Sequence, residues 1–393
     1  MTQPLKILIV HNAYSVSGGE DACVANEVNA LRGTELELQL FQVRSDPGFS
    51  GKIAAALSAA GGGFEGRLED LLRRFRPDIV HAHNLWPLLS PRLFSRAKAL
   101  GARTCLTMHN YRPLCLNGLF LTPRQEICER CAGGNYWPGI VRGCYRDSRL
   151  ASAALACHAW LSARRHWYDD VDAFIAPAEF LKNKYIARGW TADRIEIQGH
   201  FIPVMPVDPP SPPQPYVLYL GRLSREKGID WLVDLFRTNP QRRLGLKIAG
   251  TGPLLAQVQA ASGGHISYMG FLKSLEKERV LRDAAAVVMP SLCYENFPLA
   301  VVEANAWGIP ALVSDAGGLR EIVVPGINGE RYAPGDPADF WAQLNRMMSP
   351  ERMEGLRRTT QEYARTHFSS TAFLKQRMAL YHRLTCTSGG RPL

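Results

Sequence analysis

A proline-rich stretch at 203–215 separates two series of short apolar segments that alternate with helical patterns. The stretch holds seven prolines in thirteen positions, and it cannot be a helix interior or a central strand because proline fixes φ and lacks an N–H. Apolar runs of four to eight residues between helical patterns are typical of buried parallel strands. The sequence therefore predicts an α/β protein with two doubly wound, Rossmann-like domains that face a cleft.

The predicted domains are 1–202 and 216–370, joined by a linker at 203–215 and followed by a C-terminal helix and tail at 371–393. A Cys-rich insertion interrupts the first domain at about 111–147. The predicted strands are 6–10, 36–43, 77–83, 102–109 and 172–177 in the first domain, and 216–220, 245–249, 265–270, 286–290 and 309–314 in the second.

The composition excludes several classes of protein. The chain has 393 residues, of which 46% are hydrophobic and 21% charged, so a disordered or fibrous protein is excluded. No run approaches the roughly 18 consecutive apolar residues of a membrane helix. The N-terminal MTQPLKILIV lacks the basic head and cleavage site of a signal peptide. We therefore expect a cytoplasmic protein.

The net charge of +10 is concentrated in one segment, 92–149, with ten basic and three acidic side chains. Such a segment favours a phosphorylated substrate, acidic lipid headgroups or nucleic acid as a partner. The alternative is a solvated basic surface, which the charge alone favours.

A glycine-bounded turn, Gly221–Gly228, directly follows the predicted strand 216–220. Open α/β sheets bind ligands at this end of their strands, and Arg222 and Lys227 together suit a diphosphate. The alternative is a basic surface turn.

Two glutamates flank the start of a predicted helix in the segment 290–310. Pro298 suits the first turn of that helix, Glu295 precedes it and Glu303 lies within it. The unbonded N–H groups of a helix start form an anion site. Alternatively, Glu295 is a capping acid and Glu303 a solvated helix residue, although its apolar neighbours mean that its carboxylate needs a partner.

Four motifs together resemble the retaining glycosyltransferases of family 4, which have the GT-B fold. They are the turn at 221–228, the Glu295–Glu303 pair with the following GIPALVSDAGGLREIVVPGINGE, the glycine-rich HNAYSVSGGED at 11–21, and TMHN at 107–110. This chain has Asn110 where many members have Asp. The resemblance covers most of the chain, and the fold implies that the C-terminal helices return to the first domain.

The resemblance implies transfer of a hexose, with retention and without a catalytic metal, from a nucleotide-diphosphate sugar to a saccharide or lipid-linked saccharide. Arg222 and Lys227 would neutralise the leaving diphosphate, Glu303 would accept from the ribose, Glu295 would orient the sugar, and His109 would approach that sugar from the first domain. The residues assigned to the donor are Gly18, Gly19, Arg222, Lys227, Glu295, Asn296, Phe297, Pro298, Leu299 and Glu303; those assigned to catalysis are His109, Glu295, Arg222 and Lys227.

Four cysteines, Cys115, Cys128, Cys131 and Cys144, fall within a span of 30 residues inside the basic segment. A Cys-x2-Cys pair flanked by two more cysteines suits a tetrahedral, structural zinc site, and a turn-rich segment gains order from such a metal. The alternative is four unligated thiols.

The first domain is expected to receive the acceptor. Its arginines, interleaved with Trp160 and Trp167, suit the interface of an anionic membrane, so we expect peripheral contact with the inner face of the cell membrane. The alternative packs these tryptophans in the core. Two other functions stay open: a zinc-containing nucleic-acid-binding protein, which leaves the two glutamates unexplained, and a GT-B sugar-nucleotide epimerase.

Overall fold

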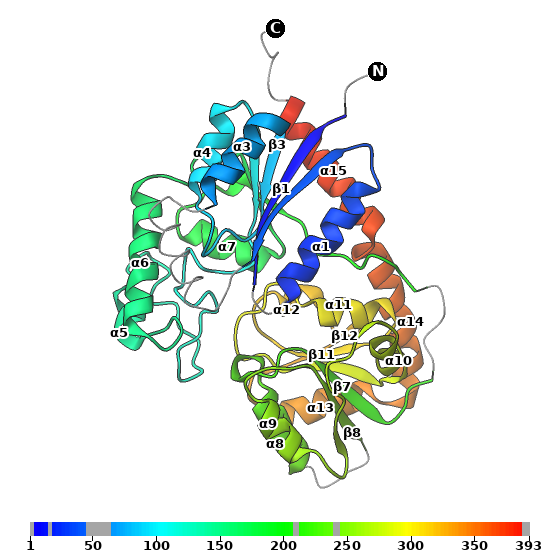
Figure 1. The fold of residues 1–393 in the computed structure, drawn as a ribbon. Helices are drawn as coiled ribbons and strands as arrows, with labels where there is room; N and C mark the ends of the chain where they lie inside the picture. The colour runs from blue at the N-terminus through cyan, green and yellow to red at the C-terminus, as the bar shows by residue number, and fades with distance from the viewer. Residues whose placement is uncertain (1–3, 15–17, 45–63, 207–211, 239–243, 387–393) are drawn as a thin grey trace. The chain divides into compact units, whose positions relative to one another are not determined.

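The computed structural model describes residues 4–14, 18–44, 64–206, 212–238 and 244–386 (Figure 1). These residues form two compact units. Unit 1 draws on Met1–Gly118, Arg130–His200 and Ser370–Leu393, and unit 2 on Leu119–Glu129 and Phe201–Ser369. Residues 207–211 of the expected linker and 387–393 of the expected tail lie outside the described residues.

Unit 1 is built on a parallel six-stranded sheet in the order β2-β1-β3-β4-β5-β6. Its central strands are completely buried, as the continuous apolar runs predict: Ile7, Leu8, Ile9 and Val10 have no exposed surface. The strands are β1 (Lys6–Ala13), β2 (Glu37–Arg44), β3 (Ile79–Ala82), β4 (Arg103–Thr107), β5 (Ala173–Ala176) and β6 (Ile195–Ile197).

Helices cover both faces of this sheet. Helix α1 packs Val24, Val28 and Leu31 on the same face as Leu380 and Tyr381 of α15 (Ser370–Cys386), so the C-terminal helix belongs to the first unit, as the fold class predicts. Figure 1 shows α3, α4 and α7 on the side of the sheet away from these two helices. The other helices of unit 1 are α1 (Gly19–Arg32), α3 (Glu65–Phe75), α4 (Arg92–Ala99), α5 (Trp137–Arg142), α6 (Arg149–Arg164), α7 (Glu179–Ala187) and the 3-10 turn η1 (Ala192–Arg194).

Unit 2 repeats the architecture with a parallel sheet in the order β12-β11-β10-β7-β8-β9. Its strands are β7 (Tyr216–Leu220), β8 (Gly245–Ala249), β9 (Ile266–Tyr268), β10 (Ala286–Met289), β11 (Ala311–Ser314) and β12 (Gly329–Tyr332). Its helices are η2 (Arg225–Lys227), α8 (Ile229–Arg237), α9 (Leu255–Ala261), α10 (Ser274–Asp283), α11 (Leu299–Ala306), α12 (Leu319–Ile322), α13 (Pro337–Met347) and α14 (Pro350–His367).

Two strands, β6 and β12, were not predicted from the sequence, and both lie at a sheet edge. Neither has a continuous apolar run: β6 reads Ile-Glu-Ile and β12 reads Gly-Glu-Arg-Tyr. Edge strands are short and often carry charged residues, so their sequence signal is weak. In the described part of the chain, no helix has the length and apolar content needed to cross a membrane.

Candidate functional site

Lys227 and Glu295 meet at the carboxyl edge of the unit 2 sheet. Lys227 lies in the turn after β7, and Glu295 lies in the loop between β10 and α11. The Lys227 ammonium donates to Glu295 Oε1 at 2.5 Å, and the Ser291 hydroxyl donates to the same oxygen at 2.5 Å. Two of the residues that the sequence analysis assigned to the donor are therefore in direct contact, and Glu295 is buried.

Glycines allow the close backbone approaches that hold this pair in place. Gly228 has a φ of +67°, and a Cβ there would lie 2.0 Å from the carbonyl oxygen of Pro290. Gly318 donates its N–H to the Glu295 carbonyl at 2.7 Å, and a Cβ there would lie 2.1 Å from the Asn296 carbonyl oxygen. A larger residue at Gly228 would separate the turn after β7 from the loop after β10, and one at Gly318 would separate the start of α12 from that same loop.

The positive charge of Lys227 is stabilised by its surroundings. Burial lowers the pKa of Lys227, but the neighbouring Glu295, Cys293 and Glu226 side chains together outweigh burial and raise that pKa above its usual value, so the ammonium stays charged. Helix α11 begins at Leu299 directly after Pro298, four residues beyond Glu295, so its first N–H groups lie in the same loop region. A cation and a helix start close together are suited to bind a phosphate group.

Arg222 and Glu303 lie in different surroundings. The Arg222 side chain is exposed and, among the described residues, makes no hydrogen bond or ion pair. Glu303 is half-buried on α11 and pairs with Lys277 of α10 at 2.9 Å. A carboxylate among apolar neighbours needs a partner, and Lys277 is that partner for Glu303. Lys277 was not predicted from the sequence.

The glycine-rich motif of unit 1 leads into α1. Gly18 caps this helix and Gly19 is its first residue; a Cβ on either would meet no atom within 4 Å, and residues 15–17 lie outside the described ranges. Asp21 accepts from the Gly18 N–H at 3.2 Å and from the Tyr14 N–H at 3.3 Å. This carboxylate also contacts His11 Nε2 at 2.8 Å and therefore ties β1 to the helix start.

Five histidines gather at the carboxyl edge of the unit 1 sheet: His11, His81, His83, His109 and His200. His83 Nδ1 lies 3.0 Å from His109 Nε2, and the His109 and His200 rings stack with centroids 5.3 Å apart. His81 has partners on both nitrogens, the hydroxyls of Tyr381 and Thr107, each at 2.8 Å. His109 is therefore one member of a packed group of rings.

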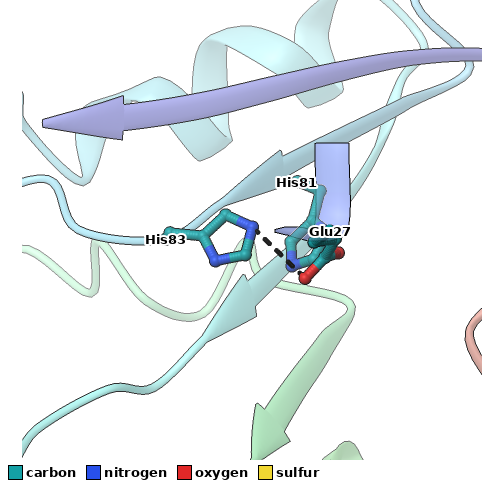
Figure 2. Close-up of side chains that lie close together, drawn as sticks. All are labelled: Glu27, His81 and His83. Atoms are coloured by element: carbon teal, nitrogen blue, oxygen red, sulfur yellow. Dashed lines mark ion pairs between the residues drawn. The ribbon is translucent and has the colours of Figure 1, made fainter. Parts of the chain in front are cut away.

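Glu27 and Arg377 contact two histidines of this group, His81 and His83. Glu27 of α1 forms an ion pair with Arg377 of α15 and lies 3.3 Å from His81 Nδ1 and 3.8 Å from His83 Nε2 (Figure 2). Carboxylate and imidazole atoms this close resemble a metal site. However, Arg377 places its own cation against Glu27 and 3.0 Å from His81 Nδ1, so the group is better described as a buried ion-pair network.

Four histidines of this group, His81, His83, His109 and His200, are kept neutral because their pKa values are lowered. Burial, followed by the charge of Arg377, lowers the pKa of His81 well below its usual value. Burial lowers the pKa of His109 and of His200 to about 3. At neutral pH His109 can accept and donate hydrogen bonds, but it does not carry a positive charge.

The four clustered cysteines are distributed over both units. Cys115, Cys131 and Cys144 belong to unit 1, and Cys128 lies in the segment 119–129 of unit 2. Cys131 is buried beside Leu116 and Tyr136, and the Cys144 N–H donates to the Gly139 carbonyl at 3.0 Å. The zinc site therefore stays a prediction from the spacing of these residues.

Solved structures share this architecture along nearly the whole chain. The lipopolysaccharide outer core galactosyltransferase WaaB is 20% identical, with a TM-score of 0.63 over 96% of this chain and all of the other. The Anabaena protein HepE, solved with UDP-glucose, is 15% identical, with a TM-score of 0.65 over 96% of this chain and all of the other. At these identities the likeness shows the fold alone, a GT-B fold.

Two family models match the two units in turn. The model described as "Glycosyl transferase 4-like domain" matches residues 19–198, and "Glycosyl transferases group 1" matches residues 206–367. The chain belongs to the family 4 type of GT-B glycosyltransferases. The resemblance of the four motifs is thereby confirmed, and a nucleic-acid-binding protein is not favoured.

Curated relatives of this family 4 chain match over part of its length. The lipopolysaccharide 1,6-galactosyltransferase of Salmonella typhimurium is 32% identical over 196 residues, which cover 46% of this chain and 53% of the relative. The glycogen synthase of Mycobacterium tuberculosis is 36% identical over 141 residues, or 34% of this chain and 33% of the relative. The chain thus spans about half or less of the length of these relatives.

Proposed function

We propose that this protein is a retaining glycosyltransferase that moves a hexose from a nucleotide-diphosphate sugar to a saccharide or lipid-linked saccharide in the synthesis of a surface polysaccharide or glycolipid. The observation that carries the proposal is the Lys227–Glu295 contact beside the start of α11. It joins a fixed cation to the unbonded N–H groups of a helix, as a diphosphate requires. The names of the solved HepE complexes and of the Salmonella relative support a nucleotide-sugar donor and a saccharide acceptor.

The donor half of the reaction is assigned to unit 2. Lys227 has three N–H groups and gives one to Glu295, so it can also donate to a phosphate oxygen. Arg222, whose guanidinium is exposed, would close on the same diphosphate as charge develops on the leaving group. Glu295 would bind hydroxyls of the sugar, and Glu303 would bind the ribose hydroxyls. The Glu303 carboxylate would then be released by Lys277 or shared with it.

The leaving diphosphate would take the proton of the acceptor hydroxyl as the new bond forms on the same face of the sugar. This order of events retains the anomeric configuration and needs no metal, because Lys227, Arg222 and the helix start stabilise the leaving group. By resemblance, His109 would contact the transferred sugar; it would do so as a neutral ring, since its pKa is about 3.

The acceptor is proposed to reach the enzyme at an anionic membrane surface. Trp137 of α5 is 67% exposed, and Leu150 and Trp160 of α6 are 85% and 54% exposed. The Arg164 guanidinium lies over the Trp160 ring. Trp160 is therefore not packed in the core, the alternative that the sequence left open for it. Exposed tryptophan and leucine among arginines suit the boundary between lipid headgroups and acyl chains.

The test of the proposal combines donor turnover with stereochemistry. Purified protein is incubated with UDP-, GDP-, ADP- and dTDP-hexoses and a saccharide acceptor, and release of the nucleoside diphosphate is measured with and without EDTA. We expect one base to be used, no loss of activity in EDTA, and a product with the anomeric configuration of the donor by NMR. An inverted product would contradict retention, and release without transfer in every mixture would contradict the transferase.

A further inference from the structure

A cavity of about 440 Å³ lies within unit 1, and all of its lining residues belong to that unit. Its walls come from α6, from the loop 188–194, and from two short segments that follow the histidine group: Trp86 lies three residues after His83, and Arg112 three residues after His109. The cavity thus adjoins the carboxyl edge of the first sheet. Its volume falls in the range of about 300–1,000 Å³ typical of small-molecule sites.

Three arginines, Arg112, Arg188 and Arg194, line this cavity. The acidic residue of the lining, Asp169, has its carboxylate 3.0 Å from Nδ1 of His166, so the lining has a positive excess. Arg188 lies where a side chain on Gly134 would collide with it: a Cβ there would be 1.9 Å from its Nη2 atom. Planar guanidinium groups are suited to bind an oxyanion by two parallel hydrogen bonds.

Two polar atoms in the cavity wall have no hydrogen-bond partner among the described residues. They are Nη1 of Arg112 and Nδ1 of His158, and both are buried. Arg112 uses its other terminal nitrogen on the Tyr14 hydroxyl at 3.4 Å. Burial lowers the pKa of His158 to about 4, so its ring is neutral near pH 7. Buried polar groups are nearly always satisfied, so these two atoms point to a ligand that supplies the missing partners.

Aromatic rings form the remaining walls. Trp86 packs against His158 with ring centroids 4.8 Å apart, and Trp190 packs against Phe174 at 4.5 Å. Ring faces of this kind bind the apolar faces of sugars or isoprenoid chains, while the guanidinium groups bind charge. The lining therefore suits a ligand with a negatively charged end and an apolar face.

We propose that this cavity binds the phosphate-bearing part of the acceptor, a saccharide phosphate or diphosphate, with the phosphate at Arg112 and Arg188 and the sugar or chain against Trp86 and Trp190. The inference rests on the proposed function, because it names the acceptor of that reaction. The phosphate ester could come from a free sugar phosphate or from a lipid carrier. The helix that lines the cavity, α6, also bears the exposed Leu150 and Trp160, which places the cavity on the element proposed to touch lipid.

The experiment is calorimetric titration of the full chain with two probes, glucose 1-phosphate and farnesyl diphosphate, and separately with UDP. We expect at least one probe to bind the wild type and Arg112→Gln to weaken that binding tenfold or more, as loss of a charged hydrogen bond does. Arg165→Gln, an exposed arginine at the end of α6 outside the cavity lining, is the matched control and should change the affinity less than twofold. Preference for glucose 1-phosphate indicates a free sugar phosphate, and preference for farnesyl diphosphate a lipid carrier.

A second variant, Ala159→Phe, fills the cavity without removing a charge and should also abolish binding. Thermal unfolding of each variant shows that it is folded, and unchanged UDP binding shows that unit 2 is intact. No binding of either probe, or equal weakening by Arg112→Gln and Arg165→Gln, overturns the cavity assignment while leaving the donor site in place. If the wild type neither binds UDP nor turns over any donor, the proposed function is contradicted instead.

Discussion

Lys227 and Glu295 are 68 residues apart in the sequence, yet the Lys227 ammonium lies 2.5 Å from a Glu295 carboxylate oxygen at the carboxyl edge of the second sheet. Parallel strands bring their carboxyl ends to one edge, and β7 and β10 are neighbours in this sheet. The contact fixes a cation and an anion next to the start of α11. The proposed donor chemistry depends on both charges being present.

Lys227→Met should lower kcat/KM about 10- to 100-fold or more, because a charged hydrogen bond to the leaving group is worth roughly 1.5–3 kcal/mol. It also leaves Glu295 buried without its cation, so Glu295→Gln in the same background should recover stability but not activity. Arg225→Gln, an exposed residue of the same turn, is the control and should keep wild-type kcat/KM. Equal losses in the Lys227 and Arg225 variants would contradict a specific role for the pair.

The free energy of unfolding should fall as the pH is lowered from about 6.5 towards 3. The folded pKa of His109 and His200 is about 3 and that of His81 lies well below 6.5, whereas in the unfolded chain each titrates near 6.5. Above pH 6.5 these rings are neutral in both the folded and the unfolded chain, so they do not change the free energy of unfolding with pH. Below pH 6.5 the unfolded chain binds more protons than the folded chain, so the free energy of unfolding falls. Each ring contributes up to about 1.4 kcal/mol per pH unit to this fall in the free energy of unfolding.

Urea denaturation at several pH values measures this slope, and His200→Asn should make it shallower. His367→Asn, an exposed histidine on α14, is the control and should leave the slope unchanged. A free energy of unfolding that is constant between pH 6.5 and 5 would contradict neutral, buried histidines.

Arg377→Met should destabilise the protein by about 3–5 kcal/mol, because it leaves the Glu27 carboxylate buried without its cation. The double variant with Glu27→Gln should recover part of that loss. Arg383→Gln, on the same helix and 53% exposed, should cost less than about 1 kcal/mol. Chemical denaturation of the three variants tests the coupling, and additive effects of Glu27 and Arg377 would contradict it.

Protein purified without chelator should contain about one zinc per chain if Cys115, Cys128, Cys131 and Cys144 bind the metal. Thiolates are preferred zinc ligands, and a four-cysteine site has no open position for substrate. Elemental analysis should show that Cys131→Ser loses its zinc. Cys157→Ser, which replaces an exposed cysteine of α6, should keep the zinc content of the wild type. Wild type that reproducibly holds far less than one zinc would leave the four residues as thiols.

Much of the fold could be predicted from the sequence because buried parallel strands leave continuous apolar runs. The runs around Ile7–Val10 and Tyr216–Leu220 identify strands of both sheets, and glycine and proline mark their ends. Strands β6 and β12 escaped because an edge strand has one unpaired side and needs no apolar run.

The site was predictable only where a residue follows a strand directly. Lys227, Glu295 and His109 could each be placed at a strand end, but not in contact with a particular partner. Glu27 and Arg377 are 350 residues apart, and each resembles an ordinary charged residue of an amphipathic helix. The cavity of unit 1 escaped for the same reason: its lining comes from segments that only the folded chain brings together.

The measurement that tests the central claim most directly is a thermal-unfolding panel with UDP, GDP, ADP, dTDP and CMP on the wild type and on Glu303→Ala. A ligand at 100 times its Kd should stabilise the folded chain by about 2.7 kcal/mol, which raises Tm by a few degrees. We predict that one diphosphate stabilises the wild type and that Glu303→Ala loses this shift, while Glu276→Ala, an exposed glutamate on α10, keeps it. No shift with any nucleotide, or the same shift in all three proteins, would contradict a nucleotide-sugar site at the start of α11.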